Sequence, residues 1–322
     1  MGLFTRKWLA ELIISMSWSS VLTGAETKDN NQEFALPSGF SGVWYDGNAE
    51  VSSYQYQVLR YGEWRTGTSV AIFVTEPFNF EKMVKSNSSK GDGIKNAMKL
   101  NLIKDFPTGI YDYNIMMSVF SGIENGAFFG VPVKVTFSSQ EWCGHVWQQT
   151  IHRANVVSTI THSYFEDEEQ DTKKAKVPQN VVLEDAVFLW ARGFTLPMVA
   201  LGEIKSRKMV VAANRTRFAH KDIGIRDATF TRAKEAEEID VSSGKFRTNR
   251  ATVTLSQEEK IDIWVEEREP HRIIKWIYDT TELKESGELM ASERLPYWQM
   301  NKSADLSKLN RIGLKPRPVM TP

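Results

Sequence analysis

The sequence is poorest in cysteine. Cys143 is the only one among 322 residues. One thiol excludes an internal disulfide, and no cysteine follows the apolar leader to take a lipid anchor. The sequence has no CxxC or HExxH spacing, so the common zinc patterns are absent as well. We therefore expect neither a metal nor another cofactor.

Net charge and long apolar runs are also lacking. Forty basic residues balance forty acidic ones, so no overall field attracts nucleic acid, and we expect no nucleic-acid partner. Beyond the first residues, no segment approaches the roughly 18 consecutive apolar residues of a membrane span. We therefore expect no transmembrane segment in the mature chain. The sequence also shows no repeat at solenoid periods.

The N-terminus resembles an export signal. Residues 1–25 combine the basic Arg6 and Lys7, a mostly apolar stretch over 8–18, and small residues at positions 23 and 25. This order is typical of a signal peptide and predicts a periplasmic or secreted protein. The alternative is a short buried helix, because Glu11 interrupts the apolar stretch.

The rest of the chain divides into three parts by composition. Residues 26–39 are polar and read as a flexible spacer, 40–302 as a single β-rich domain, and 303–322 as an extended or disordered tail. In the domain, stretches such as SYQYQVLRY and VPVKVTF alternate with period two, which is typical of half-buried strands. Turn sequences separate such stretches at short intervals, so we expect an antiparallel meander.

One segment has helical rather than strand spacing. Leu183, Val187, Trp190 and Phe194 recur at intervals of three or four, and Gly193 marks an end. A second, weaker helical candidate, RAKEAEEID, reads better as a solvated loop or edge. The predicted fold is therefore mainly β: an antiparallel open (half) barrel or strongly curved sheet with one or two short helices packed on its concave face.

The segment QEWCGHVWQQ, residues 140–149, holds the one cysteine. As a strand it places Cys143, His145 and Trp147 on one face. A turn centred on residues 153 and 154 gives three cross-strand pairs on that face. They are Cys143 with Tyr164, His145 with His162, and Trp147 with Ile160.

Several longer stretches resemble a known family of exported bacterial proteins of unknown function. They are AEVSSYQYQVLRYGEWRTGTSVAIFVTEPFN, LNLIKDFPTGIYDYNIMMSVF, QEWCGHVWQQ, HSYFE and VVLEDAVFLWARG, within residues 49–194. That family often carries the label "septum formation inhibitor Maf". True Maf proteins are pyrophosphatases with a Ser-Pro-Arg-Arg element, and this chain has no Ser-Pro dipeptide, so neither that activity nor its residues are carried over. The later half is similar in style to the LolA and LolB lipoprotein carriers, whose half-barrels close around acyl chains.

These features favour a non-enzymatic exported protein that binds an apolar or amphipathic, lipid-like ligand in the concave face of the sheet. The expected lining residues are Tyr54, Tyr56, Cys143, His145, Trp147, Ile160, His162, Tyr164, Val187 and Trp190. The simpler alternative is that these residues fill the core. Two other functions stay open: a metal- or cysteine-dependent hydrolase centred on Cys143, His145 and His162, and a scaffold that pairs with a cell-envelope protein through exposed strand edges.

Overall fold

The computed structural model describes residues 34–168 and 171–316. The predicted signal peptide and most of the predicted spacer lie outside the described residues. The strands are β1 (Ala49–Arg60), β2 (Glu63–Asn79), β3 (Val84–Lys85), β4 (Ile94–Pro107), β5 (Asp112–Gly122), β6 (Pro132–Glu141), β7 (Gly144–Arg153), β8 (Val156–His162), β9 (Asp171–Lys176), β10 (Val182–Leu183), β11 (Ile204–Val210), β12 (Ile225–Arg232), β13 (Glu237–Val241), β14 (Gly244–Thr254), β15 (Lys260–Glu266), β16 (Ile273–Asp279) and β17 (Lys284–Leu295). The α-helices are α1 (Phe40–Trp44), α2 (Val187–Ala191) and α3 (Ala213–Phe218), and 3₁₀ helices cover Glu166–Glu168, Glu184–Ala186, Tyr297–Gln299 and Ser303–Ile312.

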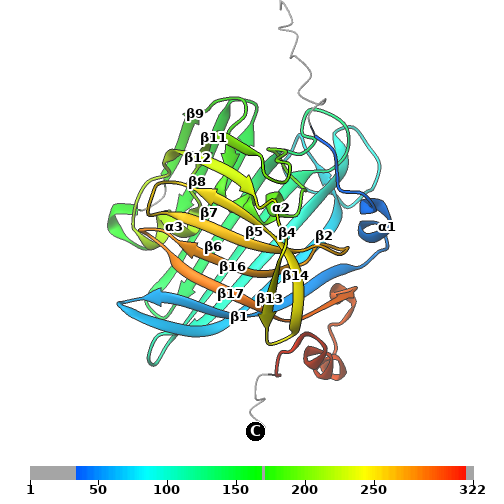
Figure 1. Ribbon diagram of the computed structural model, residues 1–322. Coiled ribbons are helices and arrows are strands. Elements are labelled where there is room, and N and C mark those ends of the chain that lie inside the picture. Colours follow the sequence, from blue (N-terminus) through cyan, green and yellow to red (C-terminus); the bar gives the residue numbers. More distant parts are fainter. Residues whose placement is uncertain (1–33, 169–170, 317–322) are drawn as a thin grey trace, which may run out of the picture.

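All seventeen strands belong to one sheet, which curves strongly around α2 (Figure 1). Neighbouring strands follow the order β9-β8-β7-β6-β5-β4-β2-β1-β17-β16-β15-β14-β12-β11-β10, with β3 on β2 and β13 on β14. Among the described strands, only β10 and β11 pair in parallel. Within the described residues β9 and β10 do not pair with each other, so the sheet stays open. The prediction of a mainly β, antiparallel, strongly curved open sheet is confirmed.

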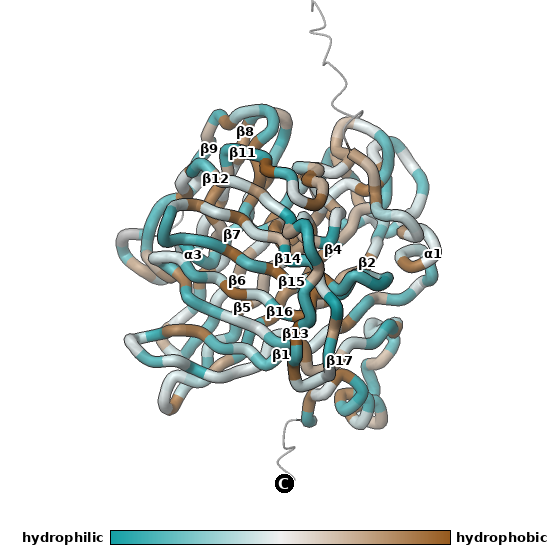
Figure 2. Tube along the Cα trace, in the orientation of Figure 1, coloured by the Kyte–Doolittle hydropathy of each residue, from teal (hydrophilic) through white to brown (hydrophobic). Residues whose placement is uncertain are grey.

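The strands alternate as their sequences predict. Tyr54, Tyr56 and Val58 point to the concave face and are fully buried, and on the neighbouring strand Phe73 joins them. Figure 2 shows this alternation as hydrophilic and hydrophobic residues following one another along the strands. The burial of apolar side chains from both arms of the curve supplies the main stabilisation of the sheet.

The predicted helix exists, and it fills the hollow of the sheet. All five residues of α2 are buried, as is the preceding 3₁₀ turn. Trp190 packs edge-on against Phe230, and its indole N–H donates to the Pro197 carbonyl at 3.0 Å. Gly193, at φ 77°, ends the helix, as predicted. Because every side of α2 is covered, it is a core element and not an amphipathic lid.

The convex face carries its own apolar cluster, which changes the predicted boundary at residue 303. Val51, Val74 and Ile312 pack together there, and the C-terminal 3₁₀ helix lies over β1 and β17. Residues 303–312 are thus folded, contrary to the predicted extended tail, because they cover apolar residues of the sheet. At the other end the fold begins before residue 40, since Phe34 is buried edge-on against Phe129.

The register of the β7–β8 hairpin differs from the predicted one. Ala154 adopts φ 49° in the two-residue turn, and Arg153 pairs with Val156. The turn centre therefore lies one residue later than predicted, and Trp147 faces His162. The predicted pairing of His145 with His162 is wrong, although the assignment of residues to the two faces survives this two-residue slip.

Candidate functional site

Four of the ten predicted ligand residues are core residues: Tyr54, Tyr56, Val187 and Trp190. The Tyr54 hydroxyl donates to the Ile273 carbonyl at 3.0 Å. The Tyr56 hydroxyl donates to the buried carboxylate of Glu285 at 2.5 Å. Burial raises the pKa of both phenols well above the ordinary value, that of Tyr54 because of desolvation and the nearby Glu50. These polar groups are thus already used inside the protein.

The other six lie in turns or on the convex side. Pairing of Phe137 with Gln148 puts Gln148 on the concave face, so Trp147 must point the opposite way, and its ring meets that of His162. Ile160 shares that convex side through its pairing with Gln149. Cys143, His145, His162 and Tyr164 are exposed. The ten residues therefore do not form one site.

Cys143 lies in the turn between β6 and β7. Its backbone N–H donates to Glu141 at 2.7 Å, and the Glu141 carboxylate, as hydrogen-bond partner, raises the pKa of the thiol. A raised thiol pKa lowers the thiolate fraction, which is the reverse of what activates a cysteine nucleophile. Among residues 34–168 and 171–316, no three His, Cys, Asp or Glu side chains are grouped as metal ligands.

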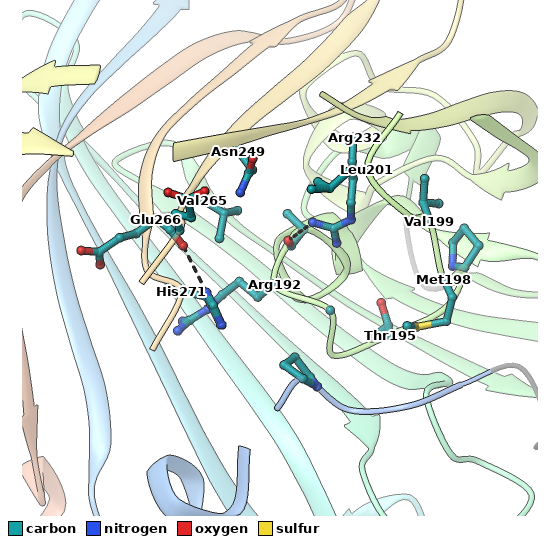
Figure 3. Close-up of a pocket in the computed structure, with 15 residues that line it drawn as sticks. Arg192, Thr195, Met198, Val199, Leu201, Arg232, Asn249, Val265, Glu266 and His271 are labelled. Carbon is teal, nitrogen blue, oxygen red and sulfur yellow. Dashed lines mark hydrogen bonds between the residues drawn. The ribbon is translucent and has the colours of Figure 1, made fainter. Parts of the chain in front are cut away.

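A cavity of about 260 Å³ opens between the segment that follows α2, the ends of β12 and β15, and the middle of β14 (Figure 3). Much of its wall is apolar. The apolar wall consists of Pro37, Ala191, Pro197, Met198, Val199, Leu201 and Val265. The remaining lining residues are Arg192, Gly193, Thr195, Arg232, Asn249, Glu266, Glu267 and His271. The volume lies just below the ~300–1,000 Å³ usual for small-molecule sites.

The end of α2 positions the cavity wall. After Gly193 the chain leaves the helix in the left-handed conformation, which any other residue would adopt at a cost. Residues 194–201 then run along the opening towards β11. Arg232, the last residue of β12, reaches back to this helix end: its two terminal nitrogens donate to the carbonyls of Ala191 and Trp190 at 2.9 and 2.8 Å.

The charges around the cavity do not cancel completely. Most of the charged residues that line it are paired, because Arg192 binds Glu50, Glu266 binds Arg272 and Glu267 binds Arg247. Arg232 forms no ion pair with any described residue, and burial lowers its pKa to about 10. Arginine still keeps its proton at neutral pH, so one uncompensated positive charge remains at the cavity.

Arg232 and Thr195 supply the free polar capacity of the site. A guanidinium has five N–H donors, and the two carbonyls of α2 occupy only part of them. The Thr195 side chain is buried, and its hydroxyl has no hydrogen-bond partner within the described residues. A cationic head beside an apolar wall can hold a molecule that has an acidic end and an apolar end.

Sequence reasoning missed Arg232, Thr195 and the cavity itself. Arg232 ends an ordinary alternating strand, and neither its type nor its spacing marks it. The usable signal was the helix end at Gly193, since a basic residue often caps such carbonyls, but the sequence does not say which arginine does so.

No family model and no curated protein matches the chain. Among solved structures it is similar to the crystal structure of a beta-barrel-like protein of domain of unknown function DUF1849 from Brucella abortus. The TM-score is 0.46 at 9% sequence identity, over 77% of this chain and 98% of that one. This likeness extends neither to the Maf label nor to LolA and LolB. No helix in the described part of the chain is both long and apolar enough to cross a bilayer.

Proposed function

We propose that this protein is an exported, non-enzymatic binding protein whose cavity at Arg232 takes a small amphipathic anion. The observation that carries the proposal is the guanidinium of Arg232, which lies at the edge of an apolar wall and has no acidic partner among the described residues. An acidic headgroup supplies the missing counter-charge, and its apolar part covers Met198 and Val199. Export rests on the basic and apolar pattern of residues 1–25.

The size of the cavity limits the ligand. One water occupies ~30 Å³ in the liquid, so 260 Å³ corresponds to roughly nine groups of that size. A carboxylate with a short alkyl chain fits this volume, whereas a whole phospholipid does not. The class of lipid-like ligands expected from the sequence is therefore restricted to molecules with a single short alkyl chain.

Titration calorimetry with octanoate, and with octanol as the uncharged counterpart, tests the proposal. We expect octanoate to bind more tightly to the wild type, and this preference to fall at least about tenfold in Arg232→Met, since one charge-assisted contact contributes about 1.5–3 kcal/mol. Arg232→Lys keeps the charge and should keep part of the preference. Arg207→Met, on β11 and outside the cavity, is the matched control.

Stability must be measured for each variant, because Arg232 also caps the carbonyls of α2. Equal affinity of the wild type for octanoate and octanol, or binding of neither, would refute the proposed headgroup site. Retention of octanoate by a folded Arg232→Met protein would refute the role of that residue.

A further inference from the structure

A second, larger cavity lies near the open edge of the sheet. It has a volume of about 590 Å³ and lies between β7, β8 and β9 on one side and α3 with the segment after it on the other. Figure 1 shows α3 beside this arm of the sheet. We call this second cavity the edge cleft. It shares no lining residue with the cavity at Arg232.

The concave face changes character where it reaches the edge cleft. On β6 the concave residues Val135 and Phe137 are apolar and belong to the main core. Their partners on β7 are Thr150 and Gln148, and the next partners on β8 are Thr159 and Thr161. The row continues on β9 with Lys173 and Asp171. Hydroxyl and amide groups thus replace hydrocarbon on β7 and β8, and charged groups follow on β9.

Two donors at the edge cleft have no acceptor among the described residues. Gln148 is only 2% exposed, and its Nε2 has no hydrogen-bond acceptor within the described residues. Its Oε1 receives only a long bond from the Thr161 hydroxyl, at 3.4 Å. The Nε of Arg217 is also buried without an acceptor among the described residues. Leaving a buried donor unpaired costs free energy, which a ligand that supplies an acceptor would recover.

The charges of the edge cleft disfavour an anion. Arg217 donates to Glu168 at 2.7 Å, and Lys173 binds Asp171 and Asp222. Lys221 binds Glu282, and Glu166 adds a further carboxylate to the lining. The lysines and the arginine that line the edge cleft therefore each have an acidic partner already. What remains is a mixture of neutral donors, hydroxyls and carboxylate acceptors.

We propose that the edge cleft binds a neutral, hydroxyl-rich ligand of the saccharide class. A sugar hydroxyl both donates and accepts, so one ring can satisfy Gln148 Nε2, the Thr159 and Thr161 hydroxyls and a rim carboxylate together. Beside the lining residue His220 lies the partly exposed Phe165, with 4.5 Å between the two ring centroids, and sugars commonly pack against aromatic rings. This site is independent of the one at Arg232.

The test is ligand-observed NMR and calorimetry with the full chain, using maltose and N-acetylglucosamine as probes and inorganic phosphate as the anion. We expect at least one saccharide to bind the wild type, and phosphate neither to bind nor to compete. Gln148→Leu removes the unpaired donor with little change in size and should weaken binding at least about tenfold. Gln149→Leu changes the adjacent glutamine, which points to the convex side, and should bind like the wild type.

Thr159→Val, which removes a hydroxyl at the same place, is a second variant in case Gln148→Leu does not fold. Binding of neither saccharide at millimolar concentration would overturn the proposal. So would equal affinity in the wild type and in folded Gln148→Leu and Thr159→Val. Phosphate binding that Gln148→Leu abolishes would show an anion site instead. Loss of octanoate binding at Arg232 has no bearing on these outcomes.

Discussion

The buried ion pair between Glu50 and Arg192 gives a quantitative prediction. Arg192 Nη1 and Nη2 bind the two carboxylate oxygens of Glu50 at 2.7 and 2.9 Å, and the side chains are 0% and 1% exposed. The guanidinium carbon also lies 4.3 Å from the centre of the Phe73 ring. Glu50→Gln keeps the shape but leaves a buried cation unpaired, which typically costs about 3–5 kcal/mol. We expect a loss of that size in the free energy of unfolding.

Urea denaturation followed by tryptophan fluorescence measures this loss. The matched control is Glu267→Gln, which breaks an arginine–glutamate contact of the same 2.7 Å length whose side chains are 71% and 45% exposed. Exposed pairs contribute about 0–1 kcal/mol, so this variant should change stability little. The double variant Glu50→Gln with Arg192→Met removes both charges and should recover part of the loss. Equal effects of Glu50→Gln and Glu267→Gln would refute the argument that burial makes the first pair important.

Three further predictions concern other parts of the molecule. Gly287→Ala should lower the free energy of unfolding, measured by urea denaturation, by at least the 1–3 kcal/mol or so that is typical of overpacking, because the new Cβ would lie 2.1 Å from a buried tryptophan ring. The control Gly42→Ala adds a Cβ that meets nothing within 4 Å, and it should leave stability unchanged. Burial, and secondly the neighbouring glutamate, raises the pKa of Asp185 from 3.8 to about 7. Between these pH values the folded state keeps a proton that the unfolded state releases. The contribution of Asp185 to the free energy of unfolding therefore falls by up to about 1.4 kcal/mol per pH unit as the pH rises from 3.8 to about 7, and it is constant above that. Asp185→Asn should lose this contribution and keep that of Glu184, whose pKa burial also raises to about 7, so the difference between its unfolding free energy and that of the wild type, measured from pH 5 to 8, must vary with pH; a constant difference would contradict the prediction. Alkylation of Cys143 by iodoacetamide should be slower than that of free cysteine and should speed up severalfold in Glu141→Gln, since that carboxylate raises the pKa of the thiol; unchanged rates would argue against the contact.

The sequence was sufficient to predict the architecture because period-two alternation is a local property. It correctly grouped Tyr54 with Tyr56, and the helical spacing that ends at Gly193 located α2. It could not decide which face of β7 is concave. Trp147 and Ile160 look like core residues, yet the pairing of β7 with β6 turns Gln148 inward instead. Which face of β7 is concave depends on its pairing with β6, and the sequence of β7 alone does not contain this information.

The candidate sites were harder to predict for the same reason. Arg232 matters because it caps the end of α2 and forms no ion pair with any described residue, and both facts depend on chain segments that are far apart in sequence. Gln148 matters because the Nε2 of its amide has no acceptor among the described residues after folding. A missing contact leaves no mark in the sequence. The one cysteine and the histidines attracted attention through their residue type, but the structure exposes Cys143 in a turn.

The pairing of β1 with β17 has a consequence for biosynthesis. These strands lie in the middle of the sheet, and the hydroxyls of Ser52 and Ser292, 240 positions apart, meet there at 2.8 Å. Closing a chain loop of that length costs about 5 kcal/mol of entropy before the contact forms. Nearly the entire polypeptide must therefore leave the ribosome before β1 and β17 can pair. A C-terminal truncation that removes β17 would disrupt the middle of the sheet and not its edge.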